Sequence, residues 1–208
     1  MQIDKANFYD IIKSMKIDYN KLMHQEISSF GSEKPKLLLH CCCAPCSSAV
    51  IEKLKNYFDI TYFFYNPNIF PQEEFEKRKH EFEKLGVNVV DVGYNHQTFV
   101  DITKGYEQEK EGGSRCRICI AERMDKAFKY GVENNFDIVT TTLSISPHKD
   151  AEFINMIGEY NQKKYGIKYL HADLKKENGY LRSTQICKER DIYRQDYCGC
   201  EFSIYKKD

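Results

Sequence analysis

The sequence predicts a single α/β domain, built on a mostly parallel sheet of about five strands flanked by helices. Short apolar runs rich in leucine, aromatic and β-branched residues alternate with longer segments whose apolar residues recur at helical spacing. The 208 residues suffice for one hydrophobic core, and no repeat, low-complexity tract or linker divides them. Strands that alternate with helices form right-handed βαβ units, which require a parallel sheet covered on both faces.

The elements of the first half follow one another in this alternating order. Segment 36–40 is a short buried strand. Apolar residues at helical spacing from Val50 to Phe58 predict a helix whose start is expected near Ser47 and Ser48. Segment 59–65 is a second buried strand that ends at an Asn-Pro turn. A helix over 73–85 ends at a glycine, and 87–92 is the third strand.

The second half continues the alternation. Segment 98–109 is predicted to be helical up to a Gly-Gly break, and the helix over 116–130 is expected to end at Gly131. Segment 137–143 is the fourth strand. The remaining predicted elements are a helix that begins after Pro147 and ends at Gly166, a strand over 167–170 and a helix over 184–195.

We expect two regions, an N-terminal helical extension over 1–35 and an α/β domain over 36–208. The first 20 residues mix charges with apolar residues and lack the apolar core of a signal peptide. No stretch approaches the roughly 18 apolar residues of a membrane span. A cytoplasmic protein without a membrane partner is therefore expected.

The charges balance, with 31 basic and 31 acidic residues. This balance argues against a protein coated in positive charge for non-specific nucleic-acid binding. A local basic surface remains compatible, because residues 161–208 carry 11 Lys and Arg against 7 Asp and Glu.

Nine cysteines are the unusual feature of the composition. Eight of them fall into three tight groups, CCCAPC, CRIC and CGC. In a reducing cytosol, clustered cysteines indicate metal or redox chemistry more often than structural disulfides. Cys41, the first residue of CCCAPC, is expected to extend the first strand as a core residue. Cys187, which lies outside the three groups, is expected to be inert inside a helix.

The expected metal site lies at the carboxyl ends of the strands, where ligands bind in such sheets. CCCAPC follows the first strand directly, and the loop SISPHKD, which contains His148 and Lys149, follows the fourth. Cys116 and Cys119 form a Cys-x-x-Cys at a predicted helix start, where free N–H groups favour thiolates. Iron–sulfur clusters require four thiolates, and a structural zinc site held by four cysteines is the simpler alternative.

The Cys198-Gly199-Cys200 segment has two interpretations that are almost equally well supported. A strained, easily reduced disulfide ring is slightly favoured, and a further pair of metal ligands is the other. Several basic residues near the cysteine groups could lower thiolate pKa values or contact RNA phosphates, although solvated surface positions explain some of them: Arg115, Arg117, Arg182, Arg190 and Arg194.

Five sequence blocks from about Lys36 to Ser203 resemble, in order, the QueH-type epoxyqueuosine reductases: LLLHCCCAPCSSAV, FYNPNIFPQEEFEKRK, GSRCRIC, TTTLSISPHKD and GYLRSTQICKERDIYRQDYCGCEFS. The resemblance implies reduction of the epoxide of epoxyqueuosine, at the wobble position of tRNA, to queuosine. This is the last step of queuosine formation, here without cobalamin. The partners implied are the modified tRNA and an unidentified electron donor, and the fold implied is HUP/PP-loop-like.

The same resemblance implies which cysteines carry the chemistry. The ligands of a 4Fe-4S cluster would be Cys42, Cys43, Cys116 and Cys119. Cys198 and Cys200 would be a redox-active catalytic pair, and Cys46 is a candidate ligand for one additional iron.

Two other functions compete with this interpretation. An iron–sulfur tRNA sulfur transferase needs a glycine-rich phosphate loop after the first strand, where this chain has CCCAPCSS instead, so ATP use is not expected. A zinc-stapled RNA-binding module would carry no iron and no colour, which separates it from an iron–sulfur enzyme.

Overall fold

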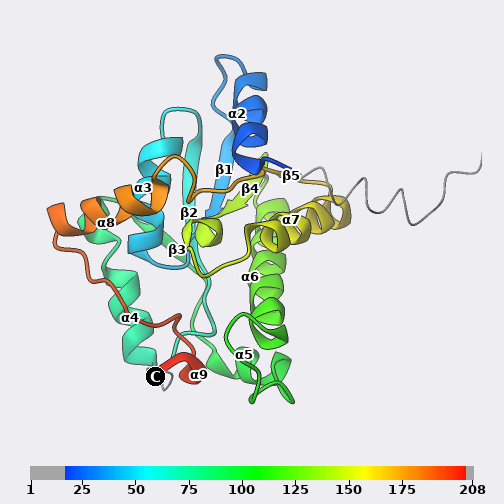
Figure 1. Cartoon of the computed structure of the whole chain (residues 1–208). Coiled ribbons are helices and arrows are strands. Elements are labelled where there is room, and N and C mark those ends of the chain that lie inside the picture. Colours follow the sequence, from blue (N-terminus) through cyan, green and yellow to red (C-terminus); the bar gives the residue numbers. More distant parts are fainter. Residues whose placement is uncertain (1–16, 205–208) are drawn as a thin grey trace, which may run out of the picture.

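The computed structural model describes residues 17–204, and its centre is a five-stranded sheet (Figure 1). Every strand pair is parallel, in the order β3-β2-β1-β4-β5. The α/β fold class and the parallel sheet are therefore confirmed. The strands are β1 (Lys36–His40), β2 (Asp59–Phe64), β3 (Val89–Asp91), β4 (Ile138–Thr141) and β5 (Lys168–Tyr169).

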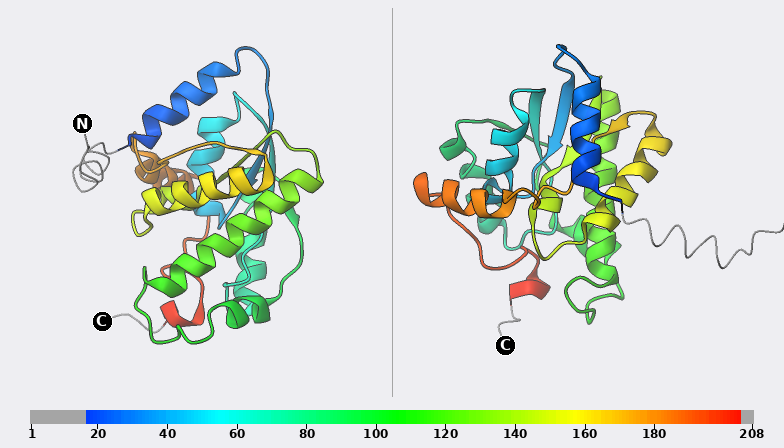
Figure 2. Two further views of the ribbon diagram at one scale, coloured as in Figure 1. Left: turned by 90° about the vertical axis from the view of Figure 1, so that its right-hand side faces the viewer. Right: turned by 45° about the horizontal axis from the view of Figure 1, so that its top comes forward.

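Helices cover both faces of the sheet (Figure 2). One face packs against α2, α3, α4 and α8, and the other against α6 and α7. The helical elements are α2 (Tyr19–Ser29), α3 (Ala44–Leu54), α4 (Gln72–His80), η1 (Glu83–Leu85), α5 (His96–Ile102), α6 (Ser114–Glu133), η2 (Thr142–Ile145), α7 (Ala151–Tyr165), α8 (Gly179–Glu189) and α9 (Glu201–Ile204).

Strand β1 shows why the strands appear in the sequence as continuous apolar runs. Leu37 and Leu39 pack into the core shared with α3 and α8, whereas Leu38 points into the core formed with α6 and α7. All three side chains are completely buried. A strand covered on both faces needs apolar residues at every position rather than at alternate ones.

Helix α3 begins three residues earlier than the serines suggested. It starts at Ala44, with Pro45 in its first turn. Backbone N–H groups in the first turn have no acceptor within the helix, so the missing N–H of proline costs no helical hydrogen bond there. The hydroxyls of Ser47 and Ser48 donate to the carbonyls of Cys43 and Pro45 within the helix instead of capping it. The early start places Cys46 in the first turn of α3.

Gly131 does not end α6, contrary to the expectation. The helix continues to Glu133, and Gly131 lies buried inside it. A Cβ atom at this position would come within 2.9 Å of the Val139 side chain. The glycine therefore allows α6 to approach β4 closely, and it has a packing role rather than a stop role.

The predicted helix over 184–195 is displaced, and the one over 98–109 is too long. Helix α8 covers Gly179–Glu189, after which Asp191 adopts a φ of 50° and the chain leaves the helix. Residues 190–200 then run from α8 past α4 to α9 (Figure 1). Helix α5 ends at Ile102, shortly before Gly105 with its φ of 88°.

Helix α2 belongs to the packed core. Its Met23 and Ile27 lie against residues of β1 and α3, and Asp18 caps its first turn by accepting from two backbone amides. Residues 1–16, the rest of the predicted helical segment, lie outside the described residues. In the described range 17–204, no helix has the length and apolar character needed to cross a bilayer.

Candidate active site

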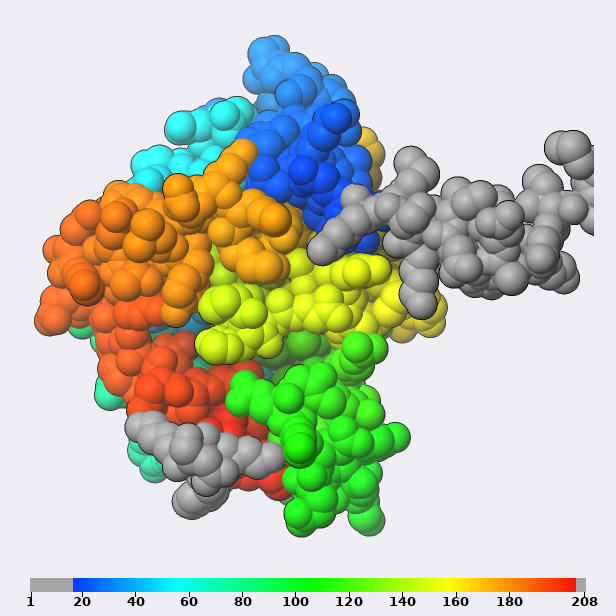
Figure 3. All heavy atoms as spheres, viewed as in Figure 1, coloured from blue at the N-terminus to red at the C-terminus, as the bar shows by residue number. Residues whose placement is uncertain are grey.

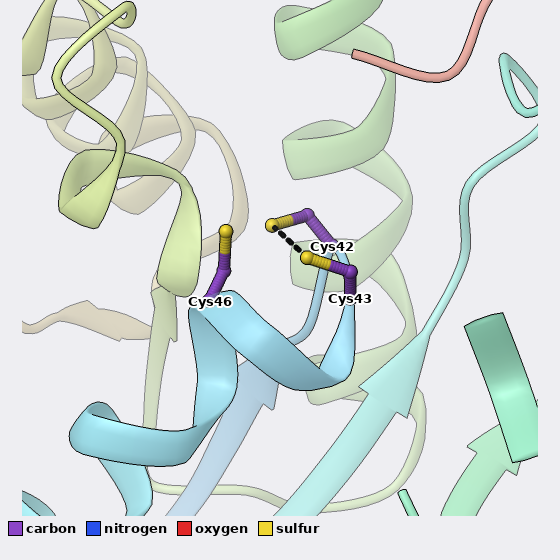
Figure 4. A group of neighbouring side chains, drawn as sticks. All are labelled: Cys42, Cys43 and Cys46. Carbon is purple, nitrogen blue, oxygen red and sulfur yellow. Dashed lines mark hydrogen bonds between the residues drawn. The ribbon is translucent and has the colours of Figure 1, made fainter. Parts of the chain in front are cut away.

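Three thiols meet at the carboxyl end of β1. Cys42 and Cys43 lie in the loop between β1 and α3, and Cys46 lies in the first turn of α3. Their sulfur atoms all lie within 4.8 Å of one another, and those of Cys42 and Cys43 are 3.9 Å apart. Figure 4 shows the three side chains turned toward one another. This group of three sulfurs is a donor set that can hold a metal ion.

Residues from two distant segments hold this group in place. The hydroxyl of Thr142 in η2 accepts from the Cys42 amide at 3.1 Å and donates to the Cys42 sulfur at 3.4 Å. The side-chain amide of Gln195 donates to the Cys43 sulfur at 3.0 Å. The ends of β1 and β4 and the C-terminal segment thus converge on these thiols.

The three thiols shift one another's pKa values in opposite directions. Hydrogen bonds from Cys43 and Cys46, together with the Lys149 cation, hold the pKa of Cys42 well below its usual range. The hydrogen bond with Cys42 raises the pKa of Cys43 to about 12, and the pKa of Cys46 is also raised by its bonds with the other two. Cys42 therefore has the lowest pKa of the three thiols, and a bound metal would release the protons of the thiols that ligate it.

The thiols line a cavity of about 580 Å³, within the size range of ligand sites. A second cavity of about 120 Å³ adjoins it and contains Cys116, Cys119 and Cys200. Cys198 lines both, as do Asn68, Arg123 and Lys149. Figure 3 shows this face of the molecule, with the C-terminal segment in orange to red beside the green residues that lead into α6.

The second cavity gathers the other cysteine groups. Cys119 and Cys200 are buried together with Phe99, and burial raises the pKa of Cys119 to about 12. Cys116, in the first turn of α6, accepts a hydrogen bond from the Gly112 amide at 3.3 Å. Burial, and then the nearby Cys198, raise the pKa of Cys200. Seven thiols from three parts of the chain thus surround two adjoining cavities.

Two cations lie between the cavities. Arg123 is 3% exposed and donates to the side chain of Asn66 and the carbonyl of Cys119. The ammonium of Lys149 lies 3.8 Å from the Cys198 sulfur, which raises the pKa of this lysine. Thiolate ligands carry negative charge that a buried site must balance. This set of thiols and cations has the chemistry that an iron–sulfur cluster needs.

Hydrogen bonds from Arg78 and Phe70 fix the backbone of the Cys198–Cys200 turn. Arg78, itself buried and paired with Glu74, donates to the Cys198 carbonyl at 3.0 Å. The Phe70 amide donates to the Gly199 carbonyl at 2.8 Å. Gly199 has a φ of 134°, and a Cβ there would lie 3.0 Å from the Arg78 side chain. Glycine is required here both by the torsion and by the close approach.

Several residues singled out from the sequence pack in the core or bond to the backbone and do not take part in the thiol groups. Cys41 and Cys187 are buried in the core, as expected. His40 is buried and bonded to Thr141, and burial, then Arg123, lower its pKa to about 4, so it is neutral. Arg115 donates to three backbone carbonyls of the loop before α6.

Other basic residues are engaged at the surface. Arg182 pairs with Glu52 and Glu189, and the exposed Arg117 lies over the Phe153 ring. The Arg190 side chain donates to the backbone of Lys84. Arg194 bonds with the Tyr180 hydroxyl, and both line the large cavity.

Sequence reasoning did not identify five residues that shape the site: Asn68, Arg78, Arg123, Thr142 and Gln195. They lie far apart in the sequence, and no motif of known spacing joins them. The only available signal was their occurrence inside or beside the five quoted sequence blocks.

Comparisons with known proteins agree with this picture. The model of the family "Epoxyqueuosine reductase QueH" matches residues 37–206. A protein of that name from Streptococcus pyogenes is 42% identical over 202 residues, covering 91% of this chain and 79% of the relative. Its counterpart in Staphylococcus aureus is 40% identical, with 94% and 88% covered, and that of Thermotoga maritima is 34% identical, with 82% and 91% covered.

Proposed function

Because this chain belongs to the epoxyqueuosine reductase QueH family, we propose that it reduces the epoxide of epoxyqueuosine in tRNA to the alkene of queuosine. The observation that carries the proposal is the convergence of seven thiols on two adjoining cavities that share Cys198. A reduction needs a source of electrons inside the site, and thiols and the metal centres they hold are such sources.

The overall reaction balances with a dithiol as the direct reductant. The epoxide takes up two electrons and two protons, both of its C–O bonds break, and the oxygen leaves as water. Cys198 and Cys200 supply both electrons and both protons and become a disulfide. Cys198 lines the large cavity, whereas Cys200 lies deeper in the second cavity. Cys198 is therefore the member that faces the substrate. An external electron donor must then reduce the disulfide for the next turnover.

We assign Cys42, Cys43, Cys116 and Cys119 as ligands of a 4Fe-4S cluster and Cys46 as a ligand of one additional iron. A cluster supplies single electrons when bound, and a further iron supplies Lewis acidity. In support, these five thiols line the two adjoining cavities, and Arg123 and Lys149 line both.

The chain's own residues organise this chemistry. Thr142 and Gln195 orient Cys42 and Cys43, and Arg78 holds the carbonyl of Cys198. The ammonium of Lys149 beside the Cys198 sulfur keeps a positive charge where the epoxide oxygen gains negative charge. Their common task is to fix the reacting groups before the substrate arrives.

The modified tRNA is proposed to lie across the mouth of the large cavity, where Tyr180, Arg194 and His148 are exposed or partly exposed. Free thiols and a tRNA substrate both point to a reducing, cytosolic location. We further propose that 36–208 is the catalytic domain, to which residues 1–35 add a helical extension.

The test is anaerobic reconstitution with iron and sulfide, followed by an assay on tRNA that carries epoxyqueuosine. A brown protein that forms queuosine is expected, and the Cys46→Ala variant should lose iron without losing sulfide. A colourless zinc protein would refute the iron–sulfur proposal. A brown protein that leaves epoxyqueuosine unchanged with a chemical reductant present would refute the reaction.

A further inference from the structure

Two asparagines of the loop between β2 and α4 line the large cavity of about 580 Å³, and they differ in their hydrogen bonding. Asn66 and Asn68 are each 1% exposed. The side chain of Asn66 is satisfied on both ends, since it donates to the Cys41 carbonyl at 2.9 Å and accepts from Arg123 at 3.2 Å. The side-chain oxygen of Asn68 is buried without a hydrogen-bond partner among the described residues.

Two further side chains of the same cavity also have a buried polar atom without a hydrogen-bond partner among the described residues. The side-chain oxygen of Gln195 is buried and unpaired within residues 17–204, while its nitrogen donates to the Cys43 sulfur. Arg78 uses Nε for Glu74 and Nη1 for the Cys198 carbonyl. Its guanidinium lies 4.9 Å from the centre of the Tyr197 ring, and its Nη2 has no hydrogen-bond partner in the described part of the chain. Two acceptors and one charged donor thus line the wall beside the thiols.

Leaving these groups unpaired is costly unless something binds them. A buried polar atom without a hydrogen-bond partner is unfavourable, and native proteins keep few such atoms. The approach of Asn68 and Arg78 to the turn is made possible by Gly199, whose missing Cβ would lie 3.0 Å from Arg78 and 3.3 Å from Asn68. The local backbone therefore holds both side chains against the redox pair.

We propose that Asn68, Gln195 and Arg78 form the receptor for the hydroxylated cyclopentane ring of the substrate nucleoside, an inference that rests on the proposed function. Ring hydroxyls donate to the two amide oxygens and accept from the guanidinium, so the three groups match one another in number and in type. The receptor contacts both the Cys43 side, through Gln195, and the Cys198 side, through Arg78. It recognises the ring and holds the epoxide between the thiol groups.

This receptor makes the protein discriminate modified tRNA from the same tRNA with guanosine at the wobble position. Equilibrium binding to both tRNAs measures the discrimination without turnover. Wild type should bind the modified tRNA more tightly. Asn68→Leu, which keeps the size of the side chain and removes both its amide oxygen and its nitrogen, should weaken binding of the modified tRNA by about tenfold and leave the unmodified tRNA unaffected.

Asn68→Asp keeps an acceptor oxygen and should retain most of the discrimination. Asn161→Leu is the matched control, because Asn161 is also a buried asparagine but lies in α7, outside both cavities. In the absence of tRNA, Asn68→Leu should leave Tm unchanged or raise it, since it removes an unpaired oxygen. A structural role for Asn68 would lower Tm instead.

The inference is overturned if Asn68→Leu discriminates as well as Asn161→Leu does, which would assign ordered water to the unpaired oxygen. It is also overturned if wild type binds the two tRNAs equally. Loss of discrimination in Asn68→Leu supports it even if wild type fails to reduce the epoxide, and in that case the proposed reaction alone is refuted.

Discussion

Replacing Thr142 by valine should disconnect Cys42 from η2 while preserving the shape of the side chain. The completely buried hydroxyl accepts from the Cys42 amide at 3.1 Å and donates to the Cys42 sulfur at 3.4 Å. Valine leaves that amide unpaired, at a cost of about 1–3 kcal/mol. We expect the free energy of unfolding to fall by about 2 kcal/mol, which lowers Tm by about 4–8 °C in a chain of this length.

Thr140→Val provides the matched control. Thr140 is also buried, and its hydroxyl donates to the Leu170 carbonyl at 2.9 Å, away from the thiols. Both variants should lose stability. Only Thr142→Val should slow alkylation of Cys42 in the reduced, metal-free protein, because the lost hydroxyl no longer stabilises the thiolate. If both variants lose equal stability and label Cys42 at the wild-type rate, Thr142 does not hold this cysteine.

Four further outcomes are expected. Cys116→Ala should lower bound iron and sulfide together, and full contents of both would remove Cys116 from the ligand set. Cys200→Ala should keep its iron and its tRNA affinity but stop after one turnover or fewer; loss of iron would make Cys200 a ligand instead. The affinity for tRNA should fall only gently with salt, whereas a slope like that of about ten phosphate contacts would contradict the small basic surplus. Burial opposes the charge of His171, but hydrogen bonds and charges from Glu26 and Glu159 outweigh it and raise its pKa. The resulting stabilisation is present below the ordinary pKa of 6.5 and disappears as pH rises through the folded-state value. His171→Gln should therefore lower Tm more at about pH 5.5 than at about pH 8.5, and an equal loss at both would refute this.

The fold was predictable because its signals are local. Continuous apolar strands and amphipathic helices revealed the order of the elements, and the first three strands lie close to the predicted segments. The errors arose where a residue type has two uses. Gly131 permits close packing instead of ending α6, and the serines after Cys46 bond within α3 instead of capping it. Only the tertiary neighbours decide between such uses.

The site was predictable in its thiols and unpredictable in their surroundings. Tight cysteine groups stand out in any sequence, and the order of strands and helices placed CCCAPC and SISPHKD at one edge of the sheet. The grouping of Cys46 with Cys42 and Cys43 depends on the early start of α3. The role of Asn68 depends on a turn 130 residues later in the chain, with which no local pattern connects it.

The position of Gln195 and Cys198 also constrains how the protein is made. Until residues 195–198 have been synthesised, the chain carries Cys42, Cys43 and Cys46 but not the segment that closes over them. During that interval the three thiols are open to solvent, and zinc and copper would occupy them in preference to ferrous iron, because both bind such donors more tightly. Insertion of the proposed iron centre is therefore expected to follow synthesis, and expression in zinc-rich medium should yield more zinc-bound protein than slow growth with iron.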